Sequence, residues 1–198
     1  MNIKEINCKT TLMPSKLPEA DYCINPYTGC LHKCVYCYAC FMKRFTNHSE
    51  NWGEFLDVKV NAANILNEEL VKKSKRKGSI LLGSVTDVYQ PAEKKFQMTR
   101  KILEVLAKYD FPVSILTKSE LVVRDINLLK KIPDCEVGLT ITSLDDRISK
   151  IFEPGASVPV KRLDALTILK NSGLKTYAFV GTILPGLTDL KLIIPALQ

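Results

Sequence analysis

Apolar and helical patterns alternate regularly along most of the chain. Short continuous apolar runs predict buried strands, and they fall at residues 79–85, 112–117, 135–142 and 174–184. Apolar positions three and four residues apart predict helices between them, at residues 61–75, 92–109, 122–132, 160–172 and 189–197. Such an order is typical of parallel strands joined by crossover helices.

The first part of the chain is less regular. Residues 1–20, with Pro14 and Pro18, predict an irregular lead-in, and residues 21–25 predict a short strand that leads into a cysteine-rich loop. An aromatic-rich loop is expected at residues 41–57. We therefore expect two parts, the lead-in at 1–20 and an α/β core at 21–198.

The five strand–helix units lack the glycine fingerprints of nucleotide-binding sheets, GxGxxG and GxxxxGK[ST]. A partial (βα)6-type barrel, truncated after its fifth strand, is the expected architecture. In such barrels the functional residues lie on loops after the carboxyl ends of the strands.

Composition adds a soluble class and a basic balance. Hydrophobic residues make up 46% and charged residues 25% of the 198 residues, and the net charge is +7. We expect a cytoplasmic protein, because the sequence contains neither an apolar run long enough for a bilayer nor a signal-peptide core. The densest basic run, at residues 72–77, is expected to complement the dipole at a helix carboxyl end.

Three of the seven cysteines crowd into one loop, as Cys30, Cys34 and Cys37 in a CxxxCxxC pattern. Soft thiolates at this spacing favour an iron–sulfur cluster or zinc over disulfides. Three thiolates on a [4Fe–4S] cluster leave one iron open for a small molecule. A zinc knuckle completed by Cys40 or His32 is the alternative.

The aromatic Tyr36 before the last cysteine makes this motif similar to that of the radical S-adenosylmethionine (SAM) superfamily. The string from Asn25 to Cys30, with Cys37-Tyr38-Ala39, resembles the branch related to spore photoproduct lyase. Further resemblance runs through residues 83–93, 116–119 and 152–155, followed by Lys161-Arg162. The resemblance implies a [4Fe–4S] cluster and SAM as cofactors, and a 5′-deoxyadenosyl radical as the reactive product.

The resemblance also implies roles for individual residues. Cys30, Cys34 and Cys37 would hold the cluster, and Tyr36 would pack at the adenine edge of SAM. Ser84 and Thr86 occupy the segment that meets the SAM amino group, and Lys118 resembles the lysine that reaches the carboxylate. Ser143 resembles a ribose or carboxylate contact, and residues 181–186 resemble the segment lining adenine. Helix capping is the simpler role for Ser84, Thr86 and Asp87, and His32 and His48 are expected to be exposed.

Two departures limit the resemblance. Spore photoproduct lyase places a hydrogen-donating cysteine on the second-strand loop, where this sequence has Ser84, so lesion repair follows less directly than cluster chemistry. The strand at 174–184 would also keep an open edge, so we expect a longer protein or a covering partner chain.

The charge and the resemblance both favour nucleic acid as the substrate, and the resemblance implies an electron donor of flavodoxin or ferredoxin type. A non-catalytic module stabilised by zinc or a closed cluster is the alternative function.

Overall fold

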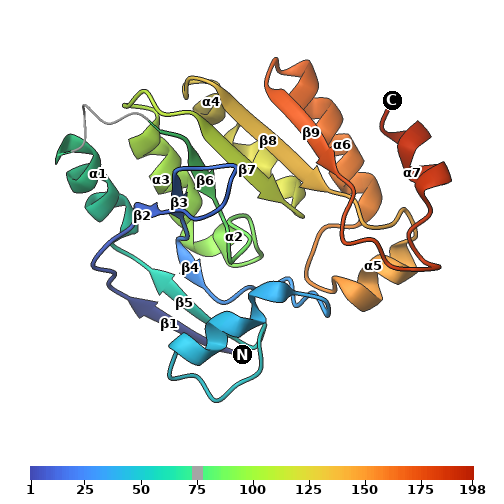
Figure 1. Ribbon diagram of the computed structural model, residues 1–198, viewed down its shortest axis with the longest axis horizontal. Helices are drawn as coiled ribbons and strands as arrows, with labels where there is room; N and C mark the ends of the chain where they lie inside the picture. The colour runs from blue at the N-terminus through green and yellow to red at the C-terminus, as the bar shows by residue number, and fades with distance from the viewer. Residues whose placement is uncertain (73–77) are drawn as a thin grey trace.

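A computed structural model describes residues 1–72 and 78–198 of the chain. Its largest feature is a six-stranded sheet in the order β2-β3-β6-β7-β8-β9 (Figure 1). Five of these strands run parallel and follow one another in chain order: β3 (Tyr22–Ile24), β6 (Ile80–Leu82), β7 (Val113–Thr117), β8 (Cys135–Thr140) and β9 (Lys175–Phe179). The expected succession of parallel strands is confirmed. The sheet is nevertheless mixed, because β2 (Met13–Pro14) pairs antiparallel with β3.

Helices connect these strands, and several differ from the sequence prediction. From residue 62 onward the described helices are α1 (Ala62–Lys72), α2 (Glu93–Phe96), α3 (Met98–Leu106), the 3-10 helix η2 (Glu120–Asp125), α4 (Ile126–Leu129), α5 (Asp146–Phe152), α6 (Pro159–Asn171) and α7 (Leu190–Ala196). Helix α5 was not predicted. Most of the basic run at 72–77 lies outside the described residues.

The helix predicted at 92–109 is broken at Gln97, which has a left-handed backbone (φ 52°). The buried Glu93 carboxylate explains the break, because it accepts hydrogen bonds from the first amides of α3, those of Thr99 (2.9 Å) and Arg100 (3.2 Å). These amides lack partners within their own helix, so a carboxylate from α2 caps α3. Similarly, the helix predicted at 122–132 is divided between η2 and α4.

A second, three-stranded sheet corrects the prediction for the first 60 residues. Strand β1 (Asn2–Ile6) pairs parallel with β5 (Phe55–Lys59), and β4 (Tyr27–Thr28) pairs antiparallel with β5 (Figure 1). Residues 1–20 are therefore not an irregular lead-in. The predicted aromatic loop at 41–57 overlaps the 3-10 helix η1 (Tyr38–Phe45) at its start and β5 at its end.

One apolar core lies between the large sheet and its helices, and it includes Leu66, Ile80, Ile102, Ile115 and Val137, all fully buried. The edge of the large sheet formed by β9 is much more exposed than its centre. Strand β9 contains no buried residue, and Phe179 at its end is 49% exposed. No helix within residues 1–72 and 78–198 is long and apolar enough to span a bilayer.

Candidate cluster and cofactor site

The loop that follows β3 and β4 forms one wall of a cavity of about 160 Å³. Its other walls come from the carboxyl ends of parallel strands: residues 83–87 after β6, Thr117 and Lys118 at the end of β7, and Thr140 at the end of β8. This is the edge at which α/β proteins with parallel strands carry their functional residues. Cys30, Cys34 and Cys37 all line the cavity.

The three cysteines are sheltered to different degrees. Cys30 is buried, whereas Cys34 and Cys37 are partly buried. Burial raises the pKa of the Cys30 and Cys34 thiols to about 12, so these thiols are protonated at neutral pH until a metal displaces the proton. Cys40 is exposed on η1 and does not line the cavity. Three soft donors around one cavity, with the fourth cysteine outside it, fit a [4Fe–4S] cluster with one open iron.

A single metal ion is a different case from a cluster, because it draws its ligands closer together. Within the described part of the chain, no three His, Cys, Asp or Glu side chains are grouped so as to hold one ion.

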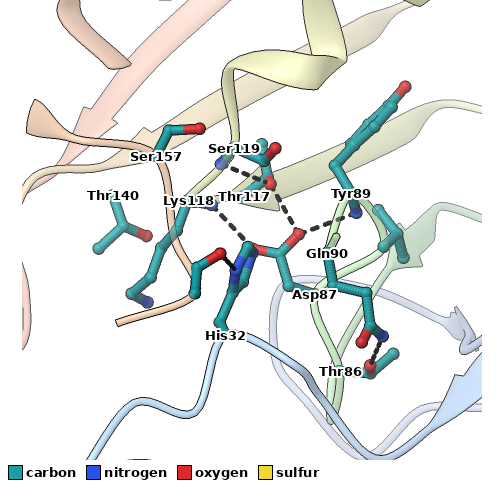
Figure 2. Close-up of polar contacts among 12 residues, drawn as sticks. His32, Thr86, Asp87, Tyr89, Gln90, Thr117, Lys118, Ser119, Thr140 and Ser157 are labelled. Atoms are coloured by element: carbon teal, nitrogen blue, oxygen red, sulfur yellow. Dashed lines mark hydrogen bonds and ion pairs between the residues drawn. The ribbon is translucent and has the colours of Figure 1, made fainter. Parts of the chain in front are cut away.

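Asp87 is the polar centre of the cavity wall (Figure 2). Its Oδ1 accepts hydrogen bonds from the Tyr89 amide (2.9 Å) and the Thr117 hydroxyl (2.7 Å), and its Oδ2 accepts one from the Lys118 amide (2.8 Å). Burial works to raise the pKa of Asp87, but its pairing with His32 and the hydrogen bonds from Thr117 and Lys118 hold it well below its usual range. Asp87 therefore joins the loop after β6 to the end of β7.

His32 joins the cysteine loop to the same carboxylate. Its Nε2 lies 3.1 Å from Asp87 Oδ2, and its Nδ1 donates to the Gly155 carbonyl at 2.8 Å, since a carbonyl can only accept. The prediction of an exposed His32 is wrong, because its exposed fraction is 2%. His48 is likewise not exposed: its ring stacks on Phe55, and Nε2 lies 2.9 Å from Asp57.

Ser84 and Thr86 both line the cavity, as their place after the second parallel strand led us to expect. Ser84 Oγ accepts from Asn25 Nδ2 (3.0 Å), and Thr86 Oγ1 donates to the Gly29 carbonyl (2.6 Å). Gln90, whose role the sequence did not reveal, bonds Thr86 and also accepts from the Leu31 amide (2.8 Å). These contacts fix the cysteine loop against the loop after β6.

Lys118 follows the end of β7 and lines the cavity (Figure 2). Its Nζ lies 5.8 Å from the centre of the Tyr36 ring. Its positive charge acts to lower the pKa of both Cys34 and Glu153, although burial is the larger effect on each. A lysine ammonium that lines an open cavity can bind an anionic ligand group.

Tyr36 and Ser143 do not line the cavity. The Tyr36 hydroxyl donates to the carboxylate of Glu153, and it lies 3.3 Å from Thr142 Oγ1. Ser143 Oγ accepts from the Asp145 amide (3.1 Å), which is a local turn before α5. The structure therefore brings together the three cysteines, Ser84, Thr86 and Lys118, and leaves Tyr36 and Ser143 outside the lining of the cavity.

Tyr38 was noted only as part of the motif, yet it belongs to the cavity wall. It is 69% exposed, and its hydroxyl donates to the Ser84 carbonyl. The feature of the sequence that points to this role is the position of Tyr38 directly after Cys37.

The sequence model of the radical SAM superfamily matches residues 24–193, and this chain therefore belongs to the radical SAM superfamily. Members of this superfamily use a [4Fe–4S] cluster and SAM. An uncharacterized protein of Methanocaldococcus jannaschii is 43% identical over 194 residues, which cover 98% of this chain and 72% of that protein. An uncharacterized protein of Mycobacterium tuberculosis is 33% identical, covering 93% of this chain and 57% of the relative.

The fold is similar to that of spore photoproduct lyase. The lyase complexed with dinucleoside spore photoproduct has a TM-score of 0.74 at 22% identity, covering 92% of this chain and 52% of the lyase. The chain thus spans about half the length of the lyase and of the mycobacterial relative, so the likeness shows the fold of this part alone.

Proposed function

We propose that Cys30, Cys34 and Cys37 bind a [4Fe–4S] cluster and that the protein cleaves SAM reductively into methionine and a 5′-deoxyadenosyl radical. The observation that carries this proposal is the placement of these three thiols, without Cys40, around one cavity that Ser84, Thr86 and Lys118 also line. The cluster, when bound, supplies the electron for cleavage. The wider core at 21–198 serves as the scaffold for this site.

The chain's own side chains would bind and orient SAM. Lys118 Nζ would attract the SAM carboxylate, and the loop of Ser84 and Thr86 would face the amino group. Tyr36 would pack at the edge of the adenine, which residues 181–186 would line, and Ser143 would contact the ribose or the carboxylate. All seven cysteines are free thiols, which agrees with our placement of the protein in the reducing cytoplasm.

The test is an anaerobic assay. Protein purified without oxygen should be brown and should release 5′-deoxyadenosine when given SAM and dithionite. Replacement of dithionite by reduced flavodoxin or ferredoxin should preserve the activity if a donor of that type serves this site. Colourless protein with one equivalent of zinc and no 5′-deoxyadenosine would favour the alternative, a non-catalytic metal-stabilised module.

A surface beside the cavity favours nucleic acid as the substrate. We call it the η1 ridge and define it as Tyr38, Phe41, Arg44 and Phe45. Phe45 is 70% exposed, and the Arg44 guanidinium carbon lies 5.6 and 5.8 Å from the centres of the Phe41 and Phe45 rings. Exposed aromatic rings interleaved with basic side chains are the surface that stacks bases and attracts phosphates. The lyase neighbour carries a dinucleoside photoproduct, which agrees with this substrate class.

Binding of a single-stranded oligonucleotide, followed by fluorescence anisotropy at fixed salt, tests the η1 ridge. Arg44→Ala should weaken binding several-fold. Lys95→Ala is the matched control, because it also removes one positive charge lying over a ring, that of Phe96 at 5.0 Å. If Arg44→Ala and Lys95→Ala weakened oligonucleotide binding equally, the η1 ridge would contribute only non-specific charge attraction.

We also propose that a further segment or a partner chain covers the open edge of β9. Unpaired strand edges are prone to association, and exposed Phe179 lies at the end of this one. Sedimentation velocity across a concentration range should show association of this chain. A monodisperse monomer at all concentrations would contradict the proposal.

A further inference from the structure

The segment Phe152–Gly155, which follows α5, lies against the cysteine loop. Two backbone hydrogen bonds join them, from the Val35 amide to the Phe152 carbonyl (2.9 Å) and from the Gly155 amide to the His32 carbonyl (2.9 Å). Two side chains of the loop bond the same segment, since His32 Nδ1 donates to the Gly155 carbonyl and the Tyr36 hydroxyl donates to Glu153. The contacts thus fall on both sides of Cys34.

Gly155 makes this approach possible. A Cβ placed on Gly155 would lie 2.8 Å from the Cα of His32 and closer still to the carbonyl oxygen of Leu31. Both are backbone atoms of the cysteine loop, so no change of rotamer could relieve the clash. Any other residue would therefore push residues 31 and 32 away from the segment.

Glu153 fastens the segment to the rest of the fold. It is 2% exposed, and it pairs with Arg162 of α6, whose Nη2 lies 2.5 Å from Glu153 Oε2. The Thr142 hydroxyl, just after β8, donates to Glu153 Oε1 at 2.9 Å. Arg162 also donates to the Thr140 carbonyl (3.1 Å) and the Ser157 carbonyl (2.6 Å). The segment is therefore held by both a strand end and a helix.

We infer that Glu153, Gly155 and Arg162 are positioning residues that hold the cysteine loop in its cluster-binding shape before any metal arrives. This inference rests on the proposed function for the meaning of that shape. A loop that is already ordered loses less conformational entropy when it binds its cluster, and its thiols already face a common cavity. The string at 152–155, which the sequence marked without a role, thereby acquires one.

The experiment measures thiol accessibility in the metal-free protein. Each cysteine is alkylated under reducing, native conditions and followed by mass spectrometry. Tyr36→Phe removes only the hydroxyl that bonds Glu153, and should make Cys34 and Cys37 react about ten-fold faster, the effect of losing one hydrogen bond to a charged acceptor. Tyr109→Phe is the matched control, because its hydroxyl bonds Asn67 at 3.0 Å, away from the cysteine loop.

Cys135, which is buried in β8, provides an internal reference. General loosening of the fold would speed its alkylation as well, whereas release of the cysteine loop would not. Unchanged Cys34 and Cys37 rates in Tyr36→Phe, or equal acceleration at Cys135, would overturn the inference. Because no metal is present, this result is independent of whether the protein cleaves SAM.

A second variant tests the close approach at Gly155. Gly155→Ala should retain several-fold less iron than wild type after anaerobic reconstitution, at unchanged helical content by circular dichroism. Gly138→Ala is its steric control, because a Cβ there would lie 2.5 Å from Cε2 of Tyr177, between β8 and β9. Equal iron loss in the two variants would contradict a specific role for Gly155.

Discussion

His32 Nε2 and Asp87 Oδ2 lie 3.1 Å apart, and their side chains are only 2% and 11% exposed. This pair joins the cysteine loop to the loop after β6, while Asp87 also accepts hydrogen bonds from Thr117, the last residue of β7, and from Lys118 directly after it. The cavity wall is therefore built around one carboxylate, which receives contacts from three separate segments of the chain.

Replacing Asp87 with asparagine should destabilise the fold. An amide can present only one acceptor oxygen, so either the Thr117 hydroxyl or the Lys118 amide would face an NH₂ group, and His32 would lose its charged partner. We expect the free energy of unfolding in urea to fall by about 2–4 kcal/mol. Asp145→Asn is the control, since asparagine caps α5 as well as aspartate does, and it should remain close to wild type. If both variants had a similar free energy of unfolding, the contacts of Asp87 would not be important for the stability of the fold.

Stability should also depend on pH through Asp87. Its pKa in the folded protein is below the unfolded value of about 3.9, so its contribution is complete above that pH and is lost as the pH falls further. The groups facing it are His32 and the Cys30 thiol. Urea midpoints measured between pH 7 and pH 3 should therefore drop more steeply for wild type than for Asp87→Asn. If the urea midpoints of wild type and Asp87→Asn fell in parallel as the pH is lowered, Asp87 would not be the source of the pH dependence.

Single alanine replacements of the cysteines should separate ligands from bystanders. Loss of Cys30, Cys34 or Cys37 should abolish iron binding and SAM cleavage, because a cluster bound through only two thiolates is not retained. Cys40→Ala should leave both largely intact, since Cys40 lies outside the cavity. Iron content and 5′-deoxyadenosine formation are the measurements. If Cys40→Ala alone removed the iron, the open-iron arrangement would be wrong.

Lys118→Ala should weaken SAM binding without removing iron. Loss of one charge-assisted contact to a carboxylate costs about 1.5–3 kcal/mol, which corresponds to a ten- to hundred-fold increase in the dissociation constant. Lys101→Ala, on the exposed surface of α3, controls for the change in net charge. An unchanged dissociation constant in Lys118→Ala would leave Lys118 as a partly exposed lysine without a binding role.

The sequence predicts the succession of parallel strands well because β6, β7 and β8 are mostly apolar runs that are largely buried. It fails where polar contacts override the local pattern. Nothing near Gln97 marks a helix break, since the cause is the side chain of Glu93. Strand β1 is mostly exposed, and its polar residues Asn2, Lys4 and Glu5 leave no hydrophobic pattern from which a strand could be predicted.

The candidate site divides in the same way. The spacing of the cysteines and the position of Lys118 after a strand could be recognised locally. The partners of His32 could not, because Gly155 is 123 residues away in the chain and Asp87 lies on another strand's loop. The hydrogen bond from the Tyr36 hydroxyl to Glu153 could not be predicted either, because only the tertiary structure brings this buried carboxylate near.

The chain order of the parallel strands has a consequence for synthesis on the ribosome. Strands β3, β6, β7, β8 and β9 each pair with the strand of the large sheet that precedes them in the chain, so every new strand finds its template already outside the exit tunnel. Strands β1 and β4 differ, because their shared partner β5 begins at Phe55 and both must wait unpaired until then. The large sheet can therefore assemble in the direction of translation, whereas the small sheet closes only after a long loop has formed.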